Sequence, residues 1–183
     1  MTQTYEELDA IALLKADHRK VEEIFAAFEK ATSKTRKQAL AEQACLELKV
    51  HTVLEEEVFY PACRGQIEED LLNEAYVEHD GAKVMINEIE AASPDDDFYD
   101  AKVKVLSEMI EHHVEEEEKR SEGMFSKARA AGLDMDALAD AMRARKVTAM
   151  EEFQAGKPAE TLTLEGDDTD KALIDTPQGK EAR

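Results

Sequence analysis

Apolar side chains recur every three or four residues in four long stretches of the chain, the spacing typical of amphipathic α-helices. The first stretch runs from about Tyr5 to Lys30, and the polar segment ATSKT follows it. The second stretch ends at Gly65, the third at the segment SPDDD, and the fourth at Gly132. The pattern therefore predicts four long helices joined by short turns.

A shorter apolar stripe after Gly132 predicts a fifth helix that ends near Phe153. From Ala155 onward the apolar residues are scattered among prolines, glycines and acidic side chains, with no sustained period. We therefore expect three parts: a four-helix unit over residues 1–132, an additional C-terminal helix over 133–154, and an acidic mobile tail over 155–183.

The composition agrees with an all-α fold and excludes some partners. Glycine (7 residues), proline (4) and aromatic residues (5%) are scarce, which disfavours a β-sandwich. The 43 acidic residues outnumber the 23 Lys and Arg, and the formal net charge is −20. A general nucleic-acid binder or anionic-membrane binder needs a basic surface, so we expect neither partner. No stretch approaches the ~18 consecutive apolar residues of a membrane span.

The cysteines and the N-terminus indicate a compartment. Cys45 and Cys63 fall in one predicted helix, where a rise of about 1.5 Å per residue puts them roughly 27 Å apart, too far for a disulfide. The N-terminal residues have no apolar run behind a basic start, so no secretory signal is predicted. We expect reduced thiols and a cytoplasmic location.

Four of the five histidines fall at matching heights in the four predicted helices. The position midway between His18 and His51 lies in ATSKT, that between His51 and His79 is Gly65, and that between His79 and His113 lies in SPDDD. Residues equidistant from a turn lie at the same level of an antiparallel helix pair. An up-down-up-down antiparallel four-helix bundle would therefore collect these imidazoles at one level of its interior.

Two glutamates join this level, because Glu55 and Glu117 lie four residues after His51 and His113 on the same helix faces. Two carboxylates buried among imidazoles are strongly disfavoured unless a cation compensates their charge. The set is too large for one tetrahedral zinc and suits two ions of iron, manganese or zinc bridged by the carboxylates. The Glu-x-x-His plan of ferritin-like dimetal proteins and the zincin pattern His-Glu-x-x-His are both absent from the sequence.

The segments LLKADHRKVEEIF, HTVLEEEVFYP, EHDGAKVMI and HHVEEEEKRSEGMF resemble the hemerythrin-like HHE cation-binding domains. The resemblance covers about Leu8 to Arg129 and implies an up-down four-helix bundle with a non-haem di-iron centre. It implies two iron ions (Fe2+/Fe3+) bridged by an oxo or hydroxo group and by carboxylates. The ligands that it implies are four terminal histidines, His18, His51, His79 and His113, and two bridging glutamates, Glu55 and Glu117.

Two positions distinguish this chain from the oxygen-carrying relatives. His112 lies five residues before Glu117, the interval that oxygen-carrying relatives use, but helical phase places His113 on the apolar stripe and His112 off it. Lys83 stands where the oxygen carriers have a further histidine, and a protonated lysine is a poor ligand. We expect more open positions than in a carrier, which favours small-molecule chemistry over reversible storage.

Other side chains near the predicted ligands have two interpretations each. Glu47 lies one turn before His51 and is our candidate catalytic residue, for proton transfer or histidine orientation, although an exposed rim carboxylate fits the sequence as well. The same alternatives apply to Glu78, directly before His79. Tyr60 and Tyr76 are interpreted as core residues, with stabilisation of a bound oxygen species as the alternative.

The residues and the resemblance together predict a non-haem di-iron protein that binds and redox-converts O2, H2O2 or NO in oxidative or nitrosative stress defence. Whether it is an enzyme, with catalase, peroxidase or NO-related activity, is left open. The alternative is a non-enzymatic oxygen or iron sensor or storage protein, and a third reading is a scaffold whose acidic tail recruits a partner. We expect a diatomic or peroxide ligand, an electron donor that the sequence does not identify, and a monomer or weak homo-oligomer.

Overall fold

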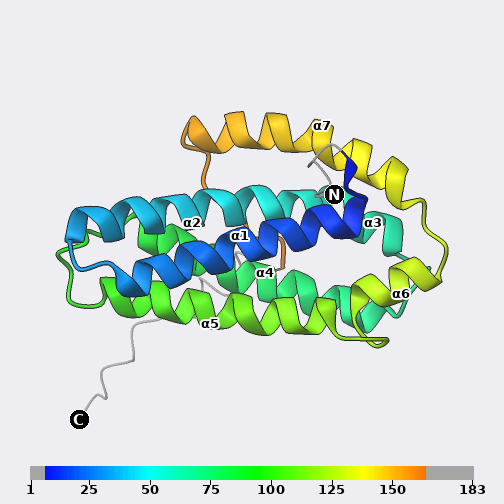
Figure 1. The fold of residues 1–183 in the computed structure, drawn as a ribbon, viewed down its shortest axis with the longest axis horizontal. Coiled ribbons are helices and arrows are strands. Elements are labelled where there is room, and N and C mark those ends of the chain that lie inside the picture. Colours follow the sequence, from blue (N-terminus) through cyan, green and yellow to red (C-terminus); the bar gives the residue numbers. More distant parts are fainter. Residues whose placement is uncertain (1–6, 164–183) are drawn as a thin grey trace, which may run out of the picture.

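The computed structural model describes residues 7–163, and every regular element in this range is helical. The all-α prediction is therefore confirmed. Four long helical segments lie side by side along the molecule (Figure 1). They are α1 (Ala10–Lys30), α2 (Lys34–Leu54) continued by η2 (Glu55–Phe59) and α3 (Tyr60–Cys63), α4 (Glu69–Glu90), and α5 (Tyr99–Glu118). The short α6 (Met124–Ala130) packs at one end, and α7 (Met135–Gln154) packs on α1 and α2.

Side chains before the first two helices fix where these helices begin. The Asp9 carboxylate accepts a hydrogen bond from the Ala12 N–H at 2.9 Å, and the Ser33 hydroxyl accepts one from the Arg36 N–H at 3.3 Å. Such caps satisfy amide groups that have no partner inside the helix. The first helix therefore begins at Ala10, later than predicted, and the predicted start at position 5 lies outside the described residues.

The second long helix contains a π-helical turn that the periodicity did not predict. The backbone N–H of Tyr60 donates to the Glu55 carbonyl, five residues earlier, so the turn holds one residue more than an α-helical turn. The extra residue rotates everything after it around the helix axis. As a result both Glu55 and Tyr60 point into the interior, where each is fully buried.

The fourth predicted helix is also interrupted. We expected it to continue to Gly132, but α5 ends at Glu118 and a tight turn leads into α6. A Cβ atom on Gly123 would lie 2.5 Å from the Glu117 carbonyl oxygen, so the turn requires glycine at this position. The turn folds α6 back and stacks the Phe125 ring on His18, with ring centroids 5.8 Å apart.

The core consists of two large apolar clusters with the histidine level between them. One contains Val21, Phe25, Leu48 and Ile86 together with the side chains toward the α1–α2 turn. The other contains residues nearer α6, with contributions from η2, α3, α6 and α7. In α1, α2 and α4 the histidine lies in sequence between residues of the two clusters. A polar layer is therefore sealed on both sides by tightly packed apolar side chains.

The structure describes the first residues of the predicted tail, 155–163. This segment passes α2 and reaches α4 (Figure 1), where Ala159 is buried and exchanges two backbone hydrogen bonds with the Asn87 side chain, at 2.9 and 3.2 Å. The remainder of the predicted tail, 164–183, lies outside the described residues.

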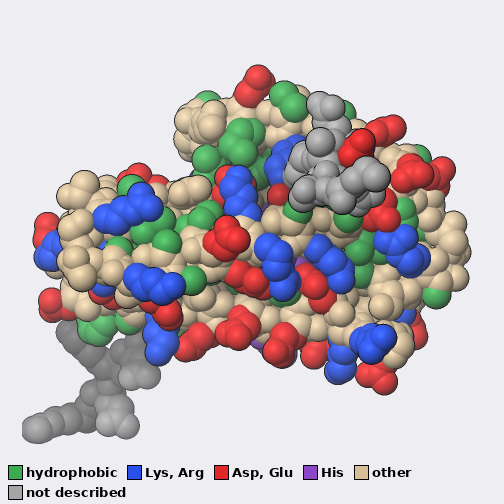
Figure 2. Space-filling model, viewed as in Figure 1, with side chains coloured by type: hydrophobic (Ala, Val, Ile, Leu, Met, Phe, Trp, Pro, Cys, Tyr) green, Lys and Arg blue, Asp and Glu red, His purple; other side chains and the backbone are tan. Residues whose placement is uncertain are grey.

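Within residues 7–163, no helix combines the length and the apolar character that crossing a membrane requires. Acidic side chains gather along the lower edge of the face in Figure 2, consistent with the net charge of −20.

Candidate metal centre

Four buried histidines, one from each long helix, meet in the polar layer of the molecule. His18 comes from α1, His51 from α2, His79 from α4 and His113 from α5, and each side chain is at most 5% exposed. Their Nε2 atoms form two close pairs, 3.0 Å apart for His18 and His51 and 3.1 Å apart for His79 and His113. The structure thus brings together at one level the four imidazoles that the turn positions predicted.

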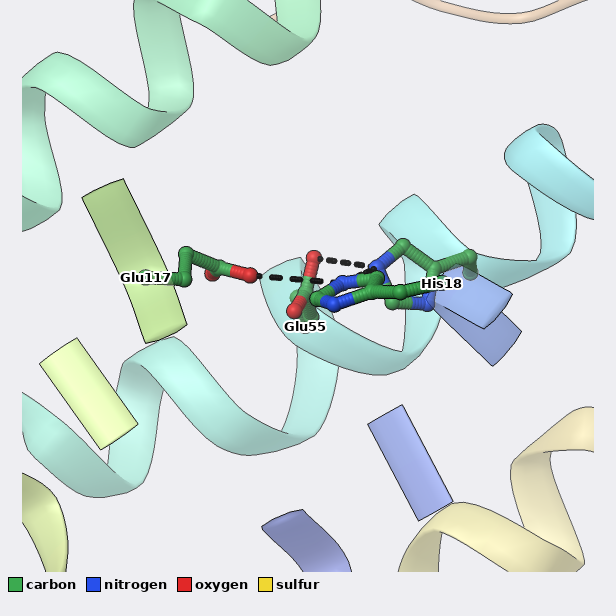
Figure 3. A group of neighbouring side chains, drawn as sticks. His18, Glu55 and Glu117 are labelled. Atoms are coloured by element: carbon green, nitrogen blue, oxygen red, sulfur yellow. Dashed lines mark hydrogen bonds and ion pairs between the residues drawn. The ribbon is translucent and has the colours of Figure 1, made fainter. Parts of the chain in front are cut away.

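Two buried carboxylates connect the two imidazole pairs. Glu55 Oε2 lies 3.1 Å from His51 Nε2 and 3.3 Å from His79 Nε2. Glu117 Oε2 lies 3.5 Å from His18 Nε2 and 3.6 Å from His113 Nε2. Figure 3 shows His18, Glu55 and Glu117 converging from different helices. Each carboxylate therefore contacts one imidazole of each pair, the arrangement that a bridging ligand needs.

Two groups of these side chains could hold a metal ion. Ligand atoms lie within 4.8 Å of one another in two groups, His18 with His51, Glu55 and Glu117, and Glu55 with His79 and His113. Glu55 belongs to both groups. Within the described residues, Glu55 Oε1 and Glu117 Oε2 are buried without a hydrogen-bond partner, which is costly unless a cation binds them. Imidazole nitrogen with carboxylate oxygen suits iron, manganese and zinc.

Burial and neighbouring charges set opposite protonation states within the cluster. Burial raises the pKa of Glu117 to about 8, and the Glu55 carboxylate adds to this shift. Burial also opposes ionisation of Glu55, but the His51 cation outweighs it and holds the pKa of Glu55 well below its usual value. Burial lowers the pKa of His18 to about 4, so its imidazole is neutral at pH 7. A neutral imidazole has a free lone pair for a metal.

Carboxylates outside the cluster hold the other ring nitrogens. Three Nδ1 atoms lie within hydrogen-bond distance of a glutamate, which fixes the ring orientation and makes the imidazole a stronger donor. These pairs are His18 with Glu118 at 2.8 Å, His79 with Glu56 at 3.0 Å, and His113 with Glu78 at 2.7 Å. For His51, Asp17 lies 3.9 Å away, beyond hydrogen-bond distance, and is itself bound by Lys146 from α7.

Three residues singled out in the sequence lie outside the cluster. Glu47 is buried, but its carboxylate accepts a hydrogen bond from Lys20 Nζ at 2.6 Å and is not among the grouped ligand atoms. His112 points away, with 63% of its side chain exposed. Lys83 is buried and turns to Glu56, 2.7 Å from its Oε1. The catalytic role of Glu47 therefore stays a prediction.

Tyr60, which the sequence led us to interpret as a core residue, contacts the centre. Its hydroxyl donates to Glu117 Oε1 at 2.9 Å and lies 3.2 Å from His79 Nε2, a contact that depends on the π-helical turn. Glu56 and Glu118, which hold His79 and His18, belong to runs of glutamates whose local pattern is typical of solvated helix faces. Their position directly after Glu55 and Glu117 was the available signal.

A small cavity adjoins the four imidazoles. Its volume is about 10 Å³, close to the minimum that holds one water molecule. The remaining wall is mostly aliphatic and is formed by Val21, Leu48, Ile110 and Val114, with Asp17 and Thr52. A larger groove of about 220 Å³ between α1 and α5 is also lined by Ile110 and Val114. These two side chains therefore separate the inner cavity from the groove.

The described residues form a helical protein. Its interior contains a buried cluster of histidines and glutamates that could bind metal. The family model of the hemerythrin HHE cation-binding domain matches residues 9–125, which include all four cluster histidines and both glutamates. The chain belongs to this family.

Two similar proteins extend the comparison. A crystal structure of a hemerythrin HHE cation-binding domain-containing protein from Mycobacterium kansasii superposes with a TM-score of 0.69 at 20% identity, covering 81% of this chain and 91% of that one. At this identity the likeness concerns the fold. A protein named DNA nickase from Nostoc sp. is 29% identical over 106 residues, which are 58% of this chain. The match covers 30% of the length of that relative.

Proposed function

We propose that the chain is a non-haem di-iron protein that binds and redox-converts O2, H2O2 or NO in defence against oxidative or nitrosative stress. The observation that carries this proposal is the arrangement of two imidazole pairs in which Glu55 and Glu117 each contact one ring of each pair. A cavity of about 10 Å³ adjoins these rings. Bound iron would supply electrons by cycling between Fe(II) and Fe(III). The proposal includes an up-down-up-down order of the four long helices, supported by the short turns between them.

The protein side chains would fix the geometry of the two ions. His18 and His51 would hold one ion, His79 and His113 the other, and Glu55 and Glu117 would bridge them. Rings that are anchored through their outer nitrogens lose little freedom when a metal binds, so the centre is preorganised. The aliphatic walls of the cavity favour a small uncharged ligand over a charged substrate.

Tyr60 would hold a proton beside the centre. Burial raises the pKa of its phenol well above the usual value, and the Glu117 and Glu55 carboxylates add to the shift. The hydroxyl therefore stays protonated at neutral pH and donates its hydrogen bond to Glu117 Oε1. In that position it would fix the orientation of one bridging carboxylate.

Adjacent histidines provide a matched test of the ligand assignment. We expect His113→Gln to lose about half of the bound iron and most of the reaction with H2O2 and NO, measured by metal analysis and with oxygen and NO electrodes. His112→Gln should retain both, because His112 is exposed. Iron loss in the His112 variant alone would overturn the assignment. An iron-loaded protein that reacts with neither H2O2 nor NO would favour the sensor or storage alternative.

The proposal also concerns compartment and partners. Both cysteines are free and buried, which supports a reducing, cytoplasmic compartment. The net charge of −20 argues against nucleic acid and anionic membranes as partners and is compatible with a monomer or weak homo-oligomer. Nicking of supercoiled plasmid by the purified protein would contradict this part, and the name of the Nostoc relative makes the assay worth performing.

A further inference from the structure

Lys83 stands where the oxygen-carrying relatives have a further histidine. In the structure its side chain binds carboxylates next to the centre. Its side chain is 4% exposed, and Nζ lies 2.7 and 2.8 Å from the two Glu56 carboxylate oxygens. Glu56 Oε1 also lies 3.0 Å from His79 Nδ1. One carboxylate therefore joins the buried ammonium group to a cluster imidazole.

The same lysine contacts a second carboxylate, which the end of the described chain binds. Asp80 is fully buried, and its Oδ1 lies 3.4 Å from Lys83 Nζ. It accepts hydrogen bonds from the Leu162 N–H at 2.8 Å, from the Thr163 hydroxyl at 2.7 Å, and from the Thr163 N–H. We call residues 157–163 the C-terminal strap.

The strap and α4 match in length. Asp80 and Asn87 are seven residues, or about two helical turns, apart on α4, a rise of roughly 10 Å. Asn87 holds Ala159, and Asp80 holds Leu162 and Thr163, three to four residues further on, which span roughly 10–13 Å when extended. The strap therefore lies along the helix face that carries Lys83.

We propose that Lys83 and Asp80 are positioning residues through which the C-terminal strap holds Glu56 and sets the orientation and donor strength of His79. The N–H and hydroxyl groups of the strap that donate to Asp80 offset its negative charge. The Lys83 ammonium group therefore stays closer to Glu56 than to Asp80. Without these donors, Asp80 attracts Lys83 more strongly and Glu56 is held less firmly. The effect is confined to the half of the centre that contains His79. This inference rests on the metal centre proposed above.

Two lysines allow a matched test. Lys83 and Lys49 are equally buried, each pairs with a glutamate, and both line one cavity of about 80 Å³ beside the strap. The partner of Lys49 is Glu90, at 2.6 Å, and not a carboxylate that holds a histidine. Lys83→Met and Lys49→Met remove the same charge and keep an unbranched apolar side chain. Thr163→Pro removes two Asp80 donors without altering any helix.

Titration of the metal-stripped full-length proteins with Co2+, followed by visible absorption, measures the two equivalents separately. In Lys83→Met we expect one equivalent to bind about 10 to 100-fold more weakly and the other to be unchanged. Thr163→Pro should weaken the same equivalent by a smaller factor, and Lys49→Met should match the wild type. Wild-type affinities in Thr163→Pro would overturn the role of the strap. An equal loss of affinity in Lys49→Met would show that removal of any buried positive charge weakens binding, and would overturn the specific role of Lys83.

A second measurement does not depend on metal. In the metal-stripped protein, 15N NMR of the imidazoles should show a changed His79 Nδ1 shift in Lys83→Met and in Thr163→Pro, and no change in Lys49→Met. An unchanged His79 signal in both variants would refute the connection. If Lys83→Met does not fold, an unchanged His79 signal in Thr163→Pro would refute the role of the strap. A wild-type protein that binds no Co2+ or iron would contradict the proposed function but leave this NMR result interpretable.

Discussion

Replacement of Glu117 by glutamine should stabilise the metal-stripped protein and destabilise the metal-loaded one. Glu117 is 2% exposed, and burial together with the nearby Glu55 carboxylate raises its pKa to about 8, compared with 4.5 for an ordinary glutamate. Glutamine has nearly the same shape and no charge. The wild type and Glu117→Gln therefore differ mainly in the free energy associated with ionisation of this carboxyl group.

The direction of the pH effect on the free energy of unfolding follows from proton binding in the folded and unfolded states. Between pH 4.5 and about pH 8, the unfolded chain has an ionised Glu117 whereas the folded, metal-stripped protein keeps the proton. The unfolded state then binds fewer protons, so the free energy of unfolding falls as the pH rises, by at most about 1.4 kcal/mol per pH unit. At pH 7 the accumulated loss is about 3 kcal/mol, which Glu117→Gln avoids. Below pH 4.5 this difference disappears.

Urea unfolding followed by circular dichroism at several pH values between 5 and 8, after chelator treatment, measures the difference. Glu116→Gln is the control, because the Glu116 side chain is 43% exposed and its pairing with Lys119 at 3.9 Å contributes little. We expect the Glu117 variant to gain stability over the wild type as the pH rises, while the Glu116 variant follows the wild type.

Metal should reverse the order of stability. A ligand that binds only the folded state stabilises it, and the wild type keeps the second bridging carboxylate that the variant lacks. A Glu117 variant that is less stable than the metal-stripped wild type at pH 7, or whose advantage does not shrink toward pH 5, would refute the electrostatic reasoning. A wild type that gains no stability from added metal would refute the ligand role of Glu117.

Three further predictions concern other residues. Glu47→Leu should leave the iron content intact and lower the turnover of peroxide or NO about 10-fold, and unchanged turnover would exclude its proposed catalytic role. Tyr60→Phe should keep both metal ions but change the optical spectrum of the oxidised protein, because Glu117 loses its phenol donor; an identical spectrum would contradict that. Burial raises the pKa of both Cys45 and Cys63 to about 12. At pH 8 roughly one thiol in 10⁴ is ionised, so a thiol reagent should label neither until the protein is unfolded; rapid labelling of the native protein is the contrary outcome.

The helical character and the heights of the four cluster histidines could be predicted from the sequence. Periodic apolar positions and turn residues are local signals, and an antiparallel hairpin converts distance from a turn into height in the bundle. His113 could be distinguished from His112 because helical phase alone decides which of two neighbours faces the core. The two glutamates one turn after a histidine required no further information.

The contacts around the centre could not be predicted in this way. Glu56, Glu118 and Asp17 read as solvated acids, since nothing local shows that a helix far along the chain places an imidazole or a lysine against them. The π-helical turn that brings Tyr60 to Glu117 changes the phase of a helix without a distinct signal in the apolar pattern.

The chain by itself determined the elements and the height of the histidines, because hydrophobic periodicity and turn chemistry act over a few residues. Only the tertiary structure decided which carboxylate holds which imidazole and that Lys83 faces Glu56 and Asp80 beside the strap. Those partners are separated by up to about a hundred residues, so packing of the whole molecule, and not local propensity, selects them.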